Sequence, residues 1–167
     1  MKFRILSRAD AIKFAKTPHD YKTIIISISN SYEYNKKLIK NSASNIQDIL
    51  YLYFDDVDTR HKENYWWDSN NDSVFKDEFG NVSTPIQKKD AKAIVDFVEK
   101  YKDSVDEIVV HCFAGVSRSA GVCAAIMKAL TGKDNEIFGN DFFVPNMMCY
   151  SMVMEEFADS GRDGIIL

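Results

Sequence analysis

The feature that most constrains this chain is the stretch His-Cys-Phe-Ala-Gly-Val-Ser-Arg-Ser at residues 111–119, set between two apolar runs. The run before it, residues 108–110, is short and β-branched, which is typical of a buried strand. The run after it, residues 119–127, consists of small and apolar residues and predicts a buried helix. The sequence therefore predicts a strand that leads through a tight loop into a helix.

A loop of this kind is suited to bind a dianion such as phosphate. Its amides and the first free N–H groups of the helix converge at the positive end of the helix dipole. Helix N-termini and cations lower a thiol pKa from about 8.5 to roughly 3.5–7.5, so we expect Cys112 to be largely thiolate at neutral pH. Arg118 adds a planar guanidinium that binds two phosphate oxygens at once. The alternative, a small buried thiol, fits poorly because histidine and arginine would flank it in a core.

The motif His111-Cys112-x-x-Gly115-x-x-Arg118-Ser119 resembles the signature of the cysteine-dependent protein tyrosine phosphatases, in which His-Cys and an arginine five residues further on are followed by Ser or Thr. The sequence of residues 115–120 is most similar to the dual-specificity branch, and particularly to small bacterial and phage proteins of that type. The resemblance implies a two-step hydrolysis of phosphomonoesters through a phosphocysteine, without a cofactor and without a metal.

The resemblance also implies a role for each residue of the motif. Cys112 is expected to attack phosphorus, and Ser119 to hydrogen-bond the departing thiolate when the phosphocysteine is hydrolysed; N-capping of the helix is a rival role for Ser119. His111 is expected to order the loop and tune the thiolate rather than to act as a base. The phosphoryl oxygens are expected to bind the main-chain N–H groups of the loop and the arginine side chain: Phe113, Ala114, Gly115, Val116, Ser117 and Arg118.

A cluster of carboxylates follows another predicted strand, residues 48–54. The carboxyl ends of strands form the ligand crevice of a doubly wound sheet, so this cluster is expected to share an edge with the cysteine motif. A carboxylic acid that protonates the leaving group typically contributes about 10²–10⁴-fold to the rate. In the resembled family an Asp on a loop after a strand has this role, and we place it on Asp56, with Asp55 and then Asp58 as alternatives.

Residues 59–83 form a longer connection than the resembled family usually has, and we predict an insertion here. Long loops in compact domains are usually functional or disordered, and the aromatic residues of this one, Trp66 and Trp67 among them, favour an ordered lid. Acids within residues 72–78, namely Asp72, Asp77 and Glu78, lie nearer the family's usual spacing and remain alternatives. Asp56 is preferred because a strand anchors it, and a proton donor needs rigid support.

The order of the predicted elements and the resemblance together imply an α/β fold with a central, mostly parallel twisted sheet and helices on both faces. A chain of 167 residues is the size of one domain, so residues 1–167 are expected to form a single phosphatase-like domain. An edge strand is expected within residues 1–6, a helix up to about residue 16, and a central strand within residues 21–29. Thr84-Pro85-Ile86-Gln87 is expected to begin a helix with its cap, first-turn proline and capping-box glutamine in register.

Charge and apolar patterning restrict the partners. The formal net charge of -4 provides no basic surface, so neither nucleic acid nor an anionic membrane is expected as a partner. No apolar run reaches the roughly 18–20 residues that cross a bilayer, and the first residues lack the apolar core of a signal peptide, so we expect a cytoplasmic protein. Cys112, Cys123 and Cys149 show no paired spacing, which suits a reducing compartment and excludes a structural zinc site.

The expected substrate is a phosphorylated protein or a small phosphomonoester, and phosphate or sulfate is expected to bind in the loop. Phosphotyrosine is the first choice, with phosphoserine and phosphothreonine open. No Lys or His lies between Cys112 and Arg118, whereas related loops that act on inositol lipids or RNA 5′-phosphates carry extra positive charge. Two alternatives remain: a binding module that holds a phosphorylated partner without turnover, and a phosphatase for a non-protein phosphomonoester.

Overall fold

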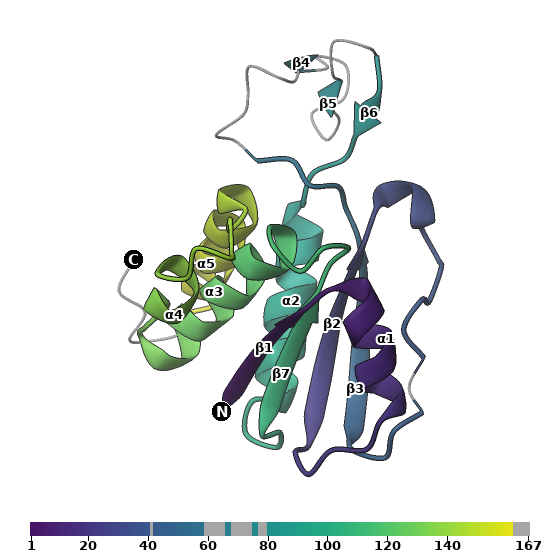
Figure 1. Cartoon of the computed structure of the whole chain (residues 1–167). Helices are drawn as coiled ribbons and strands as arrows, with labels where there is room; N and C mark the ends of the chain where they lie inside the picture. Colours follow the sequence, from purple (N-terminus) through teal and green to yellow (C-terminus); the bar gives the residue numbers. More distant parts are fainter. Residues whose placement is uncertain (41, 59–65, 68–74, 77–79, 162–167) are drawn as a thin grey trace.

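The computed structural model has a central sheet of four parallel strands with helices on both faces (Figure 1). It describes residues 1–40, 42–58, 66–67, 75–76 and 80–161. The sheet has the order β1-β7-β2-β3, so β1 and β3 are its edges. Its strands are β1 (Lys2–Leu6), β2 (Thr23–Ser29), β3 (Ile46–Tyr53) and β7 (Glu107–His111). The predicted α/β class with a parallel sheet is confirmed.

Strand β2 is buried at every position because both faces of the sheet are covered. Successive side chains of a strand point to opposite faces. Ile24 and Ile26 accordingly join one hydrophobic cluster, while Ile25 and Val109 join a second cluster with Phe14 from the first helix. A continuous apolar run therefore marks a central parallel strand, as the sequence indicates.

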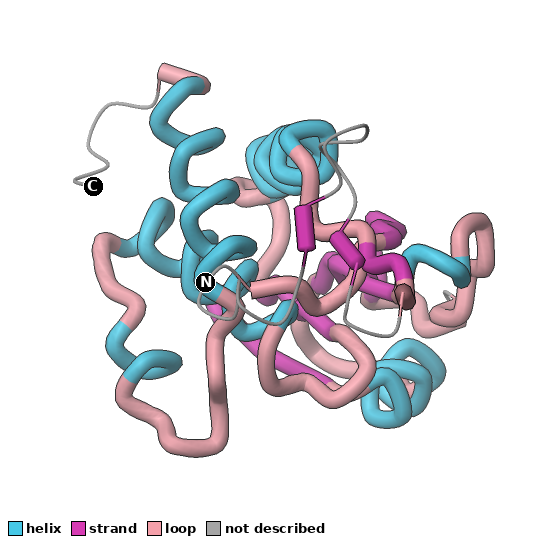
Figure 2. Tube along the Cα trace, turned by 90° about the horizontal axis from the view of Figure 1, so that it is seen from above, coloured by secondary structure: helices cyan, strands magenta, loops and turns pink. Residues whose placement is uncertain are grey.

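The two clusters correspond to the two helical layers. Helix α1 (Arg8–Lys16) covers one face, and the other long helices, which pack on one another, cover the opposite face. Seen from above, helices lie on both sides of the strands (Figure 2). The other helices are α2 (Lys88–Tyr101), α3 (Arg118–Thr131), the short α4 (Asn135–Phe138), α5 (Met147–Asp159) and the 3₁₀ turn η1 (Ser31–Glu33). None of the helices in the described part of the chain is long and apolar enough to cross a membrane.

The start of α2 differs from the prediction. The helix begins at Lys88, with Gln87 as its N-cap, and the Gln87 N–H donates to the Asp90 carboxylate at 2.8 Å. Thr84 pairs instead with the loop after β3: its N–H donates to the Asp55 carboxylate at 2.7 Å and its carbonyl accepts from the Asp55 N–H at 2.7 Å. The predicted start at residue 84 is wrong because these bonds keep the segment extended for several more residues.

The predicted insertion at residues 59–83 is described only in part. Its described residues include three short antiparallel strands, which lie beyond the carboxyl ends of the parallel strands (Figure 1). They are β4 (Trp66–Trp67), β5 (Phe75–Lys76) and β6 (Val82–Ser83). The rest of the insertion lies outside the described residues, so its action as a lid stays a prediction.

Helix α3 and the start of α5 approach so closely that only glycine fits between them. A Cβ atom on Gly121 would lie 2.3 Å from the Asn146 carbonyl oxygen. Asn146 itself is fully buried and caps α5, its side-chain oxygen accepting from the Cys149 N–H at 2.9 Å. Main-chain atoms at both sides of the contact leave little room for relaxation.

We expect Gly121→Ala to destabilise the protein by about 1–3 kcal/mol, because overpacking of a closed contact costs this much. At an unconstrained helix position the same change would stabilise by up to about 1 kcal/mol. Urea unfolding measures the difference, with Ser151→Ala at an exposed position of α5 as a control expected within about 0.5 kcal/mol of wild type. A Gly121→Ala protein as stable as wild type would show that the contact relaxes freely.

Candidate active site

The loop that follows β7, residues 112–118 and hereafter the cysteine loop, lies at the carboxyl end of the sheet and leads directly into α3 (Figure 1). Gly115 adopts a φ of 73°, and a Cβ atom there would lie 2.7 Å from the Ser7 nitrogen. The Arg8 N–H donates to the Phe113 carbonyl at 3.1 Å. The corner between β1 and α1 therefore packs directly behind the loop, and Gly115 meets both the backbone and the space requirement.

Three carbonyl groups of the cysteine loop, those of Phe113, Val116 and Ser117, accept hydrogen bonds from neighbouring segments. Besides the carbonyl already described, that of Val116 accepts from the Val144 N–H at 3.0 Å, and that of Ser117 accepts from the Asn146 N–H at 3.0 Å. Among the loop's main-chain N–H groups, that of Gly115 is the only one with an acceptor in the described part of the chain. The remaining N–H groups have no acceptor among the described residues, and their binding of an anion stays a prediction.

The Cys112 sulfur lies on the inner side of the loop. It is within 3.1 Å of the Ser119 hydroxyl oxygen and accepts from the Gly115 N–H at 3.3 Å. Burial raises the pKa of the Cys112 thiol, but the hydrogen bonds from Ser119 and Gly115 and the charge of Arg118 outweigh it, so the pKa lies below the usual value. The structure thus favours the thiolate at this position.

The other two cysteines have the opposite character. Burial raises the pKa of the Cys123 thiol to about 12, and burial raises that of Cys149 well above its usual value. Both side chains are enclosed in the core. Of the three thiols, the one in the loop is the one prepared to act as a nucleophile.

Arg118 is anchored by one nitrogen and free at another. Its Nη1 donates to the Asn30 side-chain oxygen at 2.9 Å and to the Phe54 carbonyl at 2.8 Å. Its Nε is buried and has no hydrogen-bond partner among the described residues, and the residue is only 5 % exposed. A buried donor without an acceptor costs about 1–3 kcal/mol, so a phosphate oxygen at this nitrogen would remove that cost.

His111 is fully buried behind the loop and connects it to β2. Its Nδ1 lies 3.0 Å from the Cys112 carbonyl, which can only accept, so Nδ1 carries the hydrogen. Its Nε2 accepts from the Ser27 hydroxyl at 2.6 Å. Burial lowers the pKa of His111 to about 4, with a further decrease from Arg8 and Arg118, so the ring is neutral at neutral pH. A neutral ring with both nitrogens engaged fits an ordering role rather than that of a base.

Asp56 is the carboxylate that contacts the cysteine loop. Its side chain is exposed, and its Oδ1 accepts from the Ser117 hydroxyl at 2.8 Å and from the Asn146 side-chain amide at 2.8 Å. Its Oδ2 makes no hydrogen bond within the described residues. One oxygen is held while the other is available, which is the geometry that a proton donor needs.

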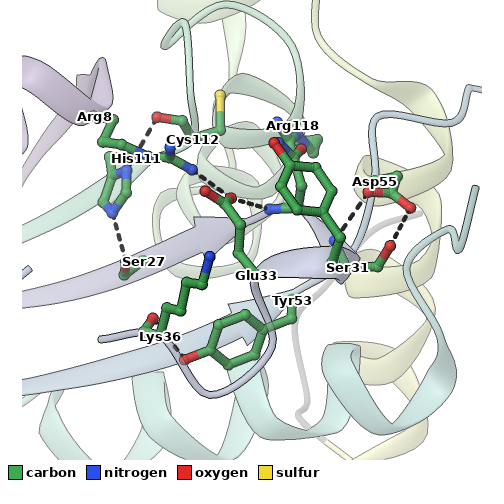
Figure 3. A network of polar contacts seen from close by, with 12 residues as sticks. Arg8, Ser27, Ser31, Glu33, Lys36, Tyr53, Asp55, His111, Cys112 and Arg118 are labelled. Carbon is green, nitrogen blue, oxygen red and sulfur yellow. Dashed lines mark hydrogen bonds and ion pairs between the residues drawn. The ribbon is translucent and has the colours of Figure 1, made fainter. Parts of the chain in front are cut away.

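The two neighbouring carboxylates bind other segments around the site. Asp55 accepts from the main-chain N–H of Ser31 at 3.0 Å and from its hydroxyl at 2.6 Å, in addition to the bond from Thr84 (Figure 3). Asp58 is buried and accepts from the Met147 N–H at 3.2 Å, at the start of α5. The alternative acids Asp72, Asp77 and Glu78 lie outside the described residues.

Two asparagines of the site have no assigned role in the sequence interpretation. Asn146 holds Asp56 and also donates to the Val57 carbonyl at 2.9 Å. Its place before the last helix is an N-cap signal, which identifies the cap but not what the amide of the side chain contacts. Asn30, which holds Arg118, follows β2 without any local signal of such a role.

Comparison with known protein families finds a match around the cysteine loop. The family model for protein-tyrosine phosphatase matches residues 80–149, which include the whole cysteine loop. This part of the chain, with the cysteine loop in it, is therefore similar to the protein-tyrosine phosphatase family. This similarity supports a cysteine-based phosphatase activity. The match does not reach Asp56, so the identity of the acid stays a prediction. No curated protein matches the chain in sequence.

Solved structures share the phosphatase fold over nearly the whole chain. The human tyrosine phosphatase-like serine/threonine/tyrosine-interacting protein is 19% identical, with a TM-score of 0.55 over 95% of this chain and 92% of that one. Tk-PTP in its active form is 13% identical, with a TM-score of 0.52 over 94% of this chain and 90% of that one. At these identities the likeness concerns the fold.

The low pKa of His111 predicts a specific pH dependence of the protein's stability. The unfolded chain takes up the proton near the ordinary histidine pKa of about 6.5, whereas the folded chain does so only at about 4. The contribution of the neutral His111 to the free energy of unfolding is therefore complete above about pH 6.5. It is lost as the pH falls toward 4, by about 3 kcal/mol in total.

His111→Gln removes this titration, so its free energy of unfolding should fall less than that of wild type between about pH 7 and pH 4.5. Urea unfolding at both pH values measures the two slopes. Other acidic groups contribute equally to both proteins and cancel in the difference. Equal slopes would contradict a buried neutral imidazole.

Proposed function

We propose that this chain hydrolyses phosphomonoesters through a phosphocysteine intermediate, as a phosphatase of protein tyrosine or dual-specificity type. The observation that carries the proposal is the Cys112 sulfur, which has a lowered pKa and lies within 3.1 Å of the Ser119 hydroxyl oxygen. All but one of the N–H groups of its loop lack an acceptor among the described residues, and the buried Nε of Arg118 has no partner there either. A nucleophile and donors for a dianion thus converge.

In the first step, the Cys112 thiolate attacks phosphorus, the sulfur–phosphorus bond forms, and the bond to the leaving oxygen breaks. Asp56 gives a proton to that oxygen from Oδ2, which makes no hydrogen bond with the described residues. The loop N–H groups and Arg118 bind the phosphoryl oxygens, since stabilising their charge dominates phosphoryl transfer. In the second step, water attacks phosphorus and gives its proton to Asp56, and Ser119 donates to the departing thiolate.

Protein phosphotyrosine is the substrate we propose first, ahead of phosphoserine and phosphothreonine. Two exposed aromatic rings support it: Phe113 within the cysteine loop is 61% exposed, and Tyr32 is 77% exposed. The Tyr32 hydroxyl lies 3.3 Å from the side-chain nitrogen of Asn30, which itself contacts Arg118. Aromatic surfaces beside a phosphate site favour an aryl phosphate, because ring contacts add to burial of apolar area.

The direct test is hydrolysis of para-nitrophenyl phosphate. We expect activity in wild type that EDTA does not change, and loss of turnover in Cys112→Ser, because a serine hydroxyl at this position is not ionised. Cys123→Ala, which removes a thiol from the core of α3, is the control that should retain activity. Full activity of Cys112→Ser, or loss of wild-type activity in EDTA, would contradict the mechanism.

The role of Asp56 is tested through the leaving group. Asp56→Asn keeps an oxygen that accepts from Ser117 and Asn146 but cannot supply the proton. We expect turnover of phenyl phosphate to fall by about 10²–10³-fold, and turnover of an ester with a more acidic leaving group to fall much less.

Asp96→Asn is the matched control, since this exposed carboxylate on α2 undergoes the same chemical change away from the site. Equal losses for both leaving groups would mean that Asp56 only supports the loop. Full activity of Asp56→Asn, together with loss of activity in Asp72→Asn or Asp77→Asn, would mean that the proton donor lies in the insertion.

A further inference from the structure

The turn after β2 holds the site's arginine with uncharged atoms. Arg118 donates through Nη1 to the side-chain oxygen of Asn30 at 2.9 Å and to the Phe54 carbonyl at 2.8 Å. Both acceptors are neutral, and Arg118 forms no ion pair with any residue that the structure describes. The guanidinium is therefore oriented without being neutralised.

The position of Asn30 is itself fixed by a buried carboxylate. Oε2 of Glu33 accepts from the Asn30 N–H at 2.9 Å and from Nη2 of Arg8 at 2.7 Å. Burial raises the pKa of Glu33, but the bonds from Arg8 and Asn30 outweigh it and the pKa lies below the usual value. Glu33 is thus an anion, and Arg8 is its counter-ion (Figure 3).

The remaining bonds of the turn connect it to both sides of the site. Ser31 donates twice to Asp55, at the end of β3 (Figure 3). Arg8 lies over the ring of Phe113, 5.2 Å from its centroid, and its own N–H holds the Phe113 carbonyl. Glu33, the carboxylate within the turn, is paired with Arg8 and therefore does not compete with a ligand for Arg118.

We propose that Asn30 is the positioning residue of Arg118: its neutral amide oxygen sets the orientation of the guanidinium, and the full positive charge remains for the phosphoryl group. The pair of Glu33 and Arg8 fixes Asn30 from behind. This inference rests on the proposed function, because it assumes that Arg118 binds the phosphoryl oxygens. A carboxylate at position 30 would orient the guanidinium equally well but would attract it and share its charge.

The test is the isosteric change Asn30→Asp, compared with Asn30→Ala. Tungstate serves as the oxyanion, and its dissociation constant is measured by calorimetry at neutral pH. We expect Asn30→Asp to weaken binding by about tenfold, because a charge next to Arg118 opposes the ligand. Asn30→Ala should weaken binding less, since it loosens the guanidinium without neutralising it.

Gln47→Glu is the matched control, because it adds the same charge at an exposed position near the amino end of β3. It should bind tungstate within about twofold of wild type, since exposed charges farther apart than about 10 Å are largely screened. Thermal unfolding of each variant separates loss of the fold from loss of binding. The KM for para-nitrophenyl phosphate should rise in parallel with the tungstate dissociation constant.

A purely structural role predicts the opposite order, with Asn30→Asp near wild type and Asn30→Ala the weaker binder, and that order would overturn the inference. Binding by Asn30→Asp equal to wild type would overturn it as well. A wild-type protein that binds tungstate but hydrolyses no phosphomonoester would defeat the proposed function alone. A wild-type protein that binds no tungstate would defeat both.

Discussion

The hydrogen bonds that draw the carbonyl groups of the cysteine loop outward are the interaction on which the site depends. They come from the Arg8 N–H at the start of α1 and from the N–H groups of Val144 and Asn146 before α5. With the carbonyls engaged on the outside, the N–H groups remain for the inside, where the Cys112 sulfur already accepts from one of them. The bond from Gly115 adds to those from Ser119 and to the charge of Arg118 in lowering the thiol pKa, and the other loop N–H groups are those proposed to bind a dianion.

The same neighbours serve more than one part of the chemistry. Asn146 binds the loop through its main chain and Asp56 through its side chain, while it also caps α5. Arg8 binds the loop through its main chain and Glu33 through its guanidinium. A few buried polar residues thus fix the nucleophile, the proposed acid and the arginine together.

Sequence reasoning succeeded where a local pattern carries the information. The apolar run of β2 identifies a strand buried on both faces, and the motif from His111 to Ser119 identifies the loop and its helix, because each depends on adjacent residues. It failed at the start of α2, where the bonds between Thr84 and Asp55 override a local helix-start signal. Asn30 could not be found at all, since its role depends on a contact with Arg118 across 88 positions of sequence.

The pairing of β1 with β7 has a consequence for how the molecule assembles. The first strand joins a partner that lies about a hundred residues later, at Phe3 opposite Ile108. Contacts of such long sequence separation form slowly, because the closure of the intervening chain must come first. During synthesis from the amino terminus, β1 and α1 must therefore wait for β7 before they can support the cysteine loop. The support that the corner between β1 and α1 gives to the cysteine loop therefore depends on the pairing of the chain's first strand with β7.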